Sequence, residues 1–281
     1  MASLSCTPAD GWDDRPEAEP PAPVFVGPED RQALVMLPDG YYAGRPALPI
    51  VLLLGGYDWF AADLDDWIGI SRYRDEFLLV MPDGLIDSEG SPTWNATDTC
   101  CDFDEAGTDD VGYLLGLVDE VRVRFATTQH VAVIGHSAGG FMGYRLACEP
   151  DSPVTTLVSM AGSSWLNAED CDATHPIRLL QVHGSEDDVM PFDGDETAPG
   201  AEEVVDRWAD RAGCDVGSWT YEEEGREYVY DGIGDETTVG RYEEGCEEPV
   251  ELWEIEGSDH YPDVNAAFRL DLVRYLFPPR G

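Results

Sequence analysis

The sequence predicts a single α/β domain in which helices flank a mostly parallel central sheet. Runs of strand length, such as Leu48–Leu54 and Phe77–Met81, are apolar at nearly every position, which is typical of strands buried on both faces. Segments with helical periodicity alternate with these runs along the chain. The length of 281 residues and the 43% content of hydrophobic residues suffice for one large core.

The N-terminal segment, residues 1–30, is rich in Pro, Asp, Glu and Ala, so we expect a disordered leader or linker before a folded domain over 31–281. Residues 31–37 and 48–54 flank the turn-forming Pro38-Asp39-Gly40 and are expected to form an antiparallel pair that opens the sheet. The second of these runs has the pattern of a central strand.

Further elements follow from apolar periodicity and from turn residues. Helices are expected over 62–74, 109–125, 201–212 and 263–277, and strands over 77–81, 130–134, 155–160, 177–182 and 251–255. Residues 218–248 alternate as short strands and predict an acidic hairpin insertion.

Ser137 lies in the pentapeptide Gly135-His136-Ser137-Ala138-Gly139, between an apolar run and a helical pattern. Glycine spacing of this kind occurs where a strand turns sharply into a helix and leaves a serine hydroxyl exposed above the sheet. The setting, more than the pentapeptide, nominates Ser137 as a nucleophile. The N–H of Ala138 at the start of the helix would form half of an oxyanion hole.

A carboxylate and a histidine follow Ser137 in the order expected of a Ser-acid-His triad. Asp187 comes a few residues after the strand over 177–182, and Asp188 is the alternative. His260 is the only histidine after these acids and follows the last predicted strand. We predict that His260 is the base and that Asp187 orients it.

Aromatic and glycine residues at other strand ends indicate where substrate would lie. Gly55-Gly56-Tyr57 follows the strand over 48–54, so the Tyr57 N–H is expected to be the second oxyanion donor. Ligand sites in open α/β sheets gather at such carboxyl ends. The substrate-binding candidates in these loops are Trp59, Trp94 and Trp165. No cofactor is expected, and no ordered calcium-binding loop predicts a metal.

Charge excludes several classes of partner. The chain holds 58 acidic and 16 basic residues, for a formal net charge of −42, and every basic residue is Arg. Nucleic acids and anionic membranes are therefore poor partners. No apolar run reaches the length of a membrane span. We expect a monomer that acts on an ester or polyester substrate, with a surface suited to high salt.

The seven cysteines favour a disulfide-bearing protein, secreted or held at the cell envelope. Cys214 and Cys246 flank the alternating segment and form the most plausible bridge, whereas Cys100, Cys101, Cys148 and Cys171 are expected to form two more with open connectivity. Cys6 is left over. No hydrophobic signal segment precedes it, so this chain is expected to be a mature or trimmed form.

Several motifs together resemble the secreted polyhydroxybutyrate depolymerase and feruloyl esterase group of α/β-hydrolases, over about residues 31 to 278. They are Trp94-Asn95 with Cys100-Cys101, the run from Asp109 to Leu114, the run from Gly139 to Cys148, and His183-Gly184 before Asp187. Where this group usually has a His-Gly pair at the first oxyanion loop, this chain has Gly55 at the His position.

This resemblance implies an α/β-hydrolase catalytic domain over 31–281 with Ser137, Asp187 and His260 as triad and Tyr57 with Ala138 as oxyanion donors. It implies a serine esterase that forms an acyl-enzyme on polyhydroxyalkanoate, feruloyl-type esters or an aromatic polyester such as PET. Trp165 falls where related polyester hydrolases have an aromatic clamp. The alternatives are a catalytically silent binding protein of the same fold, an acyltransferase or a thioesterase.

We expect the melting temperature to rise as sodium chloride is increased. The Debye length is about 30 Å at 0.01 M salt and about 3 Å at 1 M, so salt screens most of the mutual repulsion of the carboxylates. Thermal unfolding followed by circular dichroism between these limits checks this. A melting temperature that is flat or that falls would mean that the negative charge is neutralised in another way.

Overall fold

The computed structural model describes residues 23–42, 44–230 and 236–277. They include a ten-stranded sheet with the order β1-β2-β4-β3-β7-β8-β9-β12-β11-β10. These strands are β1 (Val24–Val26), β2 (Ala33–Met36), β3 (Leu48–Leu54), β4 (Leu78–Met81), β7 (Thr127–His136), β8 (Thr156–Met160), β9 (Arg178–Gly184), β10 (Trp219–Tyr221), β11 (Thr237–Tyr242) and β12 (Val250–Ile255). The six strands from β4 to β12 in this order are parallel, and both edges are antiparallel.

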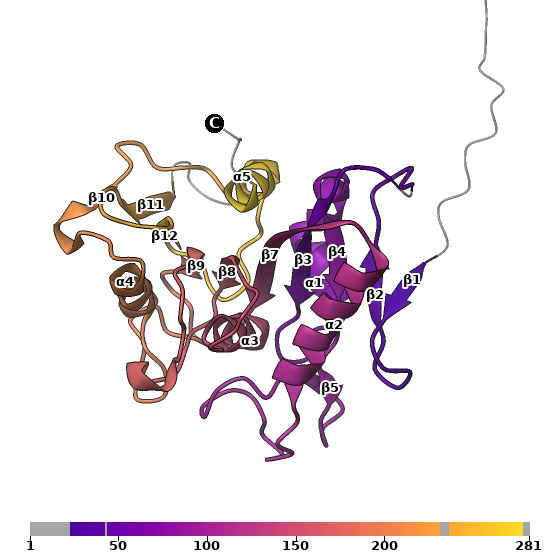
Figure 1. The fold of residues 1–281 in the computed structure, drawn as a ribbon. Coiled ribbons are helices and arrows are strands. Elements are labelled where there is room, and N and C mark those ends of the chain that lie inside the picture. Colours follow the sequence, from indigo (N-terminus) through magenta and orange to yellow (C-terminus); the bar gives the residue numbers. More distant parts are fainter. Residues whose placement is uncertain (1–22, 43, 231–235, 278–281) are drawn as a thin grey trace, which may run out of the picture.

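Helices cover both faces of this sheet (Figure 1). They are α1 (Ala61–Ile68), α2 (Asp110–Arg124), α3 (Ala138–Ala147), α4 (Ala201–Arg211) and α5 (Ala266–Leu276), with 3₁₀ segments η1 (Ile70–Glu76), η2 (Ala168–Asp170) and η3 (Val216–Ser218). A small separate hairpin pairs β5 (Leu85–Ile86) with β6 (Pro92–Thr93). In the described part of the chain, no helix is both long and apolar enough to cross a membrane.

Side-chain alternation along β7 divides the core into two layers. Val131 and Val133 pack with α2, α3 and α4, whereas Ala132 and Ile134 pack with α1 and α5. Successive side chains of a strand point to opposite faces, so a strand that is apolar throughout needs a cover on both sides. The predicted α/β class with a mostly parallel, helix-flanked sheet is confirmed.

Three local predictions differ from the structure. Residues 24–26 of the expected leader form β1, because Val24 and Val26 flank Phe25 in an apolar triplet that pairs with β2. The expected pairing of residues 31–37 with 48–54 is wrong, since β4 lies between β2 and β3. The helix expected over 62–74 ends at Ile68, where Gly69 adopts a left-handed conformation with φ 66°. Residues 1–22 of the expected leader lie outside the described residues.

Three disulfides lie in the described chain. Cys214 pairs with Cys246, as predicted, and the four remaining described cysteines pair as Cys148–Cys171 and Cys100–Cys101. The Cys100–Cys101 loop borders the cavity next to Ser137. Cys6 lies outside the described residues.

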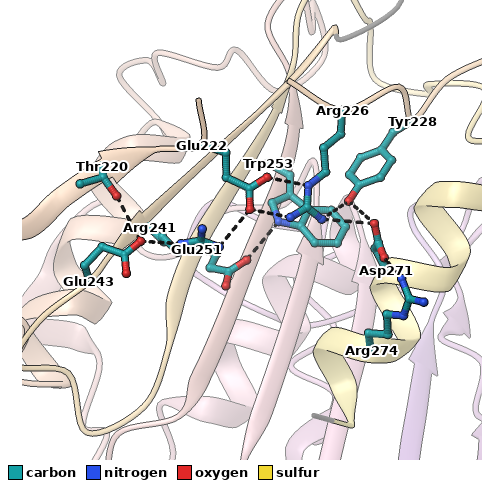
Figure 2. Close-up of polar contacts among 10 residues, drawn as sticks. All are labelled: Thr220, Glu222, Arg226, Tyr228, Arg241, Glu243, Glu251, Trp253, Asp271 and Arg274. Carbon is teal, nitrogen blue, oxygen red and sulfur yellow. Dashed lines mark hydrogen bonds and ion pairs between the residues drawn. The ribbon is translucent and has the colours of Figure 1, made fainter. Parts of the chain in front are cut away.

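A network of arginines and carboxylates links the antiparallel β10–β12 edge to α5 (Figure 2). Glu222 accepts hydrogen bonds from Arg226, whose Nε lies 2.7 Å from Oε2, and from Arg241 at 3.1 Å. Arg226 also contacts Asp271 on α5 at 3.2 Å. Shared partners make such a network worth more than isolated surface ion pairs. Arginine suits this role because its planar group donates in several directions at once.

Candidate active site

Ser137 occupies the sharp turn between β7 and α3. Its φ is 50°, a value that residues other than glycine rarely adopt and that is often found at functional sites. Its N–H donates to the Met160 carbonyl at 2.9 Å, which anchors the turn to the end of β8. A Cβ at Gly139 would lie 2.1 Å from the Leu54 carbonyl oxygen, so only glycine lets α3 begin against the end of β3.

Asp187 and His260 form a buried pair. His260 Nδ1 lies 2.7 Å from Asp187 Oδ2, and both residues are at most 5% exposed. The other carboxylate oxygen accepts from the N–H groups of Val189 and Met190 at 2.9 and 2.8 Å. Burial raises the pKa of Asp187, but hydrogen bonds from His183, His260 and Met190 outweigh it and hold this pKa well below its usual range. Asp188, the alternative acid, is exposed.

His136, the residue before Ser137, connects the turn between β7 and α3 to the loop that carries His260. Its Nε2 lies 3.1 Å from the His260 carbonyl oxygen, and the two imidazole rings are 4.8 Å apart. Burial is the main reason that the pKa of His136 falls to about 3. His136 is therefore neutral near pH 7 and donates its Nε2–H to that carbonyl.

His260 Nε2 points away from Asp187, since the opposite ring nitrogen holds the carboxylate. It is buried and has no hydrogen-bond partner among the residues that the structure describes. A buried ring nitrogen without a partner is costly unless a ligand or a reacting group uses it.

The loop after β3 lies against the turn that carries Ser137. A Cβ at Gly56 would be 3.2 Å from the Ser137 Cβ, and one at Gly55 would be 2.2 Å from the Trp59 carbonyl oxygen. A side chain at position 55 would therefore collide with the backbone of this loop. This collision explains why the chain has glycine where the resembling group has histidine. The Trp94 indole donates to the Gly55 carbonyl at 2.9 Å and braces the loop from behind.

A cavity of about 510 Å³ opens beside Ser137. One side is apolar and is lined by Phe103, Phe141, Val189 and Met190. Three acids, Asp87, Glu89 and Asp104, line the cavity as well. Tyr57 also borders it, and its hydroxyl donates to Asp87 Oδ2 at 2.9 Å.

The three tryptophans predicted to bind substrate do not line this cavity. Trp94 is 1% exposed and its indole donates to the Gly55 carbonyl, so it supports the loop after β3. Trp165 is 7% exposed and lies beneath Arg145, beside a different depression of the surface. Trp59 packs with Trp67, His136 and Tyr261 on the His260 side of the site. Of the three, Trp94 and Trp165 are buried and Trp59 is half-buried, all outside the lining of the cavity beside Ser137.

Sequence reasoning missed two residues beside Asp187. His183 Nε2 lies 3.3 Å from Asp187 Oδ2, and Gln181 Nε2 lies 3.0 Å from His183 Nδ1. Gln181 and His183 are two residues apart in β9, so their side chains point to the same face of the sheet. This spacing is the sequence signal that could have predicted that they lie together. The described residues contain no group of three or more His, Cys, Asp or Glu side chains that could hold a metal ion.

The chain is similar in sequence to proteins that carry esterase names. The provisionally named esterase NocK of Nocardia uniformis subsp. tsuyamanensis is 31% identical over 163 residues, which are 56% of this chain and 46% of that protein. The probable feruloyl esterase C of Aspergillus flavus is 25% identical over 248 residues, 81% of this chain and 76% of that protein. No protein-family profile matches the chain.

Among solved structures, the acetyl xylan esterase from Aspergillus awamori superposes with a TM-score of 0.63 at 11% identity, over 90% of this chain and 99% of that one. The protein has the α/β-hydrolase fold. The relatives with feruloyl esterase names confirm the resemblance to that esterase group, which the motifs indicated. The chain spans less than half the length of its Nocardia relative.

Replacing Trp94 with Phe should lower kcat for ester hydrolysis on the order of tenfold with little change in KM. The substitution leaves the Gly55 carbonyl without its buried donor, which costs about 1 to 3 kcal/mol and loosens the loop that is predicted to donate to the oxyanion. Steady-state kinetics with p-nitrophenyl acetate measures both constants.

Trp165→Phe is the matched control, since Trp165 is also buried but does not contact this loop. Equal kinetics for the two variants would contradict a role of Trp94 in supporting the loop.

Proposed function

We propose that the protein is a serine carboxylic ester hydrolase that acts through an acyl-enzyme. The observation that carries this proposal is a serine on a strained turn, open to a cavity and next in sequence to His136, whose ring lies 4.8 Å from that of His260 in the buried His260–Asp187 pair. Among the described residues, His260 Nε2 has no hydrogen-bond partner. In this proposal His260 Nε2 takes the Ser137 proton as the hydroxyl oxygen attacks the ester carbonyl carbon.

Asp187 then stabilises the imidazolium that forms on His260 and keeps the Nδ1 proton in place. The N–H groups of Tyr57 and Ala138 stabilise the oxyanion, Ala138 because it begins α3, whose first N–H groups have no partner within the helix. The alcohol leaves with the proton from His260. Water then attacks the acyl-enzyme by the same steps, which releases the acid and restores Ser137.

The cavity favours a neutral, mainly apolar acyl group. Phe103, Phe141, Val189 and Met190 contact such a group through dispersion and burial. Hydroxycinnamoyl-type esters fit this description and agree with the names of the fungal relatives. Polyesters, aliphatic or aromatic, are a second candidate class, because Phe103 and Val189 at the cavity are 64% and 56% exposed and could contact a polymer.

Three disulfides support export of the protein to an oxidising compartment, where such bonds persist. We extend the proposal to a secreted or cell-envelope enzyme.

Ser137→Ala and His260→Ala should each lower kcat/KM for p-nitrophenyl esters by about 10³-fold or more while the melting temperature changes little, because triad members act as a unit. Asp187→Asn should lower kcat/KM severely, and Asp188→Asn should lower it only mildly.

A fluorophosphonate probe should label the wild-type protein at Ser137 and leave Ser137→Ala unlabelled. Unlabelled wild type would favour the silent binding protein, and faster transfer to alcohols than to water would favour an acyltransferase.

Charge in the cavity yields a separate expectation about substrates. A backbone hydrogen bond from Ser91, with further bonds from Tyr57 and Glu89, lowers the pKa of Asp87, so this carboxylate is ionised at neutral pH. An ester with an anionic acyl group should therefore react more slowly than its neutral analogue. Glu89 lines the same cavity, so Glu89→Gln should narrow this rate difference by up to about fivefold, which corresponds to the roughly 1 kcal/mol that two like charges 4 Å apart cost in water.

The comparison uses p-nitrophenyl hemisuccinate and its neutral methyl ester. The control is Asp119→Asn, which removes an equal charge on the exposed side of α2, away from the cavity lining. If Asp119→Asn narrows the rate difference between the two esters as much as Glu89→Gln does, then the overall charge of the chain, and not the cavity, sets the preference for neutral esters.

A further inference from the structure

A chain of buried hydrogen bonds leads to Asp187 Oδ2, the same carboxylate oxygen that His260 contacts. Its members are Gln181 and His183 on β9, which are 0% and 3% exposed, and Tyr144 on α3. The Tyr144 hydroxyl donates to Gln181 Oε1 at 2.8 Å. His183 Nε2 lies 2.8 Å from the Met190 carbonyl oxygen and 3.3 Å from Asp187 Oδ2.

The direction of each hydrogen bond follows from carbonyl groups, which only accept. Gln181 Nε2 lies 2.9 Å from the Gly162 carbonyl oxygen, so that atom must be the amide nitrogen. The same nitrogen lies 3.0 Å from His183 Nδ1, which therefore accepts and carries no proton. The Met190 carbonyl independently requires that His183 Nε2 donate. Two separate contacts thus select the same neutral tautomer.

Protonation of His183 would place an Nδ1–H donor against the amide N–H donor of Gln181. The Gln181 amide could not flip to relieve this without losing its hydrogen bonds to the Gly162 carbonyl and the Tyr144 hydroxyl. The titratable groups around His183 are Asp187 on the loop after β9, His136 at the end of β7, Tyr144 on α3 and, across Asp187, His260. Only Asp187 is anionic among them, because burial raises the pKa of Tyr144.

We propose that Gln181 is a positioning residue that keeps His183 a neutral donor, so that the charge of Asp187 stabilises the imidazolium of His260 alone. This inference rests on the proposed function of the triad. A neutral His183 donates its Nε2–H to the Met190 carbonyl and forms no ion pair with Asp187, whereas an imidazolium 3.3 Å from Asp187 Oδ2 would compete with His260 for the carboxylate charge.

The test in activity is Gln181→Glu, in which a carboxylate of the same size accepts from a His183 Nδ1–H and permits an imidazolium. The imidazolium of His260 is then less stabilised, so the acidic limb of kcat/KM should move to lower pH by on the order of one unit. We expect kcat to fall on the order of tenfold and KM to stay within about twofold.

Tyr144→Phe is the control, because it removes one bond of the same amide without changing the atom that faces Nδ1. An unmoved acidic limb in Gln181→Glu, or the same movement in Tyr144→Phe, would overturn the proposal.

The tautomer can be measured in the wild-type protein, whether or not the variants fold. Long-range ¹H–¹⁵N spectra of histidine-labelled protein, assigned by the loss of signals in His183→Gln, should show an unprotonated Nδ1 and a protonated Nε2 at the pH at which the activity is measured. A proton on Nδ1 would overturn the proposal. This readout does not depend on ester hydrolysis, so its failure is distinct from a failure of Ser137 to react with a fluorophosphonate.

Discussion

The contact between the end of β3 and the start of α3 is the constraint on which the site depends. Backbone meets backbone there, since a Cβ at Gly139 would lie 2.1 Å from the Leu54 carbonyl oxygen. This approach places the loop with Tyr57 beside Ser137, and a larger residue would separate the two segments that our proposal assigns to oxyanion binding. The indole of Trp94 then fixes the loop from the other side through Gly55.

Parallel strand order brings the remaining groups to the same edge. β7, β8, β9 and β12 are neighbours, so the loops that follow them all emerge at the carboxyl ends, where Ser137, Asp187 and His260 lie. Burial makes the polar contacts at this edge strict: each buried donor or acceptor needs a partner, which determines the tautomers of His136 and His183. Among the described residues, His136 Nδ1 and His260 Nε2 at this edge have no hydrogen-bond partner, and the proposed mechanism uses His260 Nε2.

Charge is distributed differently on the surface and in the interior. The net charge of −42 lies mostly on exposed carboxylates, whereas Arg226 and Arg241 gather carboxylates into one network between β10–β12 and α5 (Figure 2). An arginine with several partners holds an edge that has few apolar contacts, since β10 exposes two of its three residues. Salt weakens exposed repulsion more than it weakens such short, partly buried pairs.

The sequence by itself determined the fold class, the strand β3 and the nomination of Ser137, Asp187 and His260, because apolar periodicity, glycine spacing and residue order are local or one-dimensional signals. It also singled out the Cys214–Cys246 bridge, which the structure contains. Only the tertiary structure decided that β4 separates β2 from β3, that Trp94 and Trp165 pack inside, and that Gln181 and His183 stand behind Asp187. Strand order and side-chain contacts depend on residues far apart in the chain. A local pattern therefore does not show which strand end an aromatic ring will pack against, or which carboxylate a buried amide will lie near.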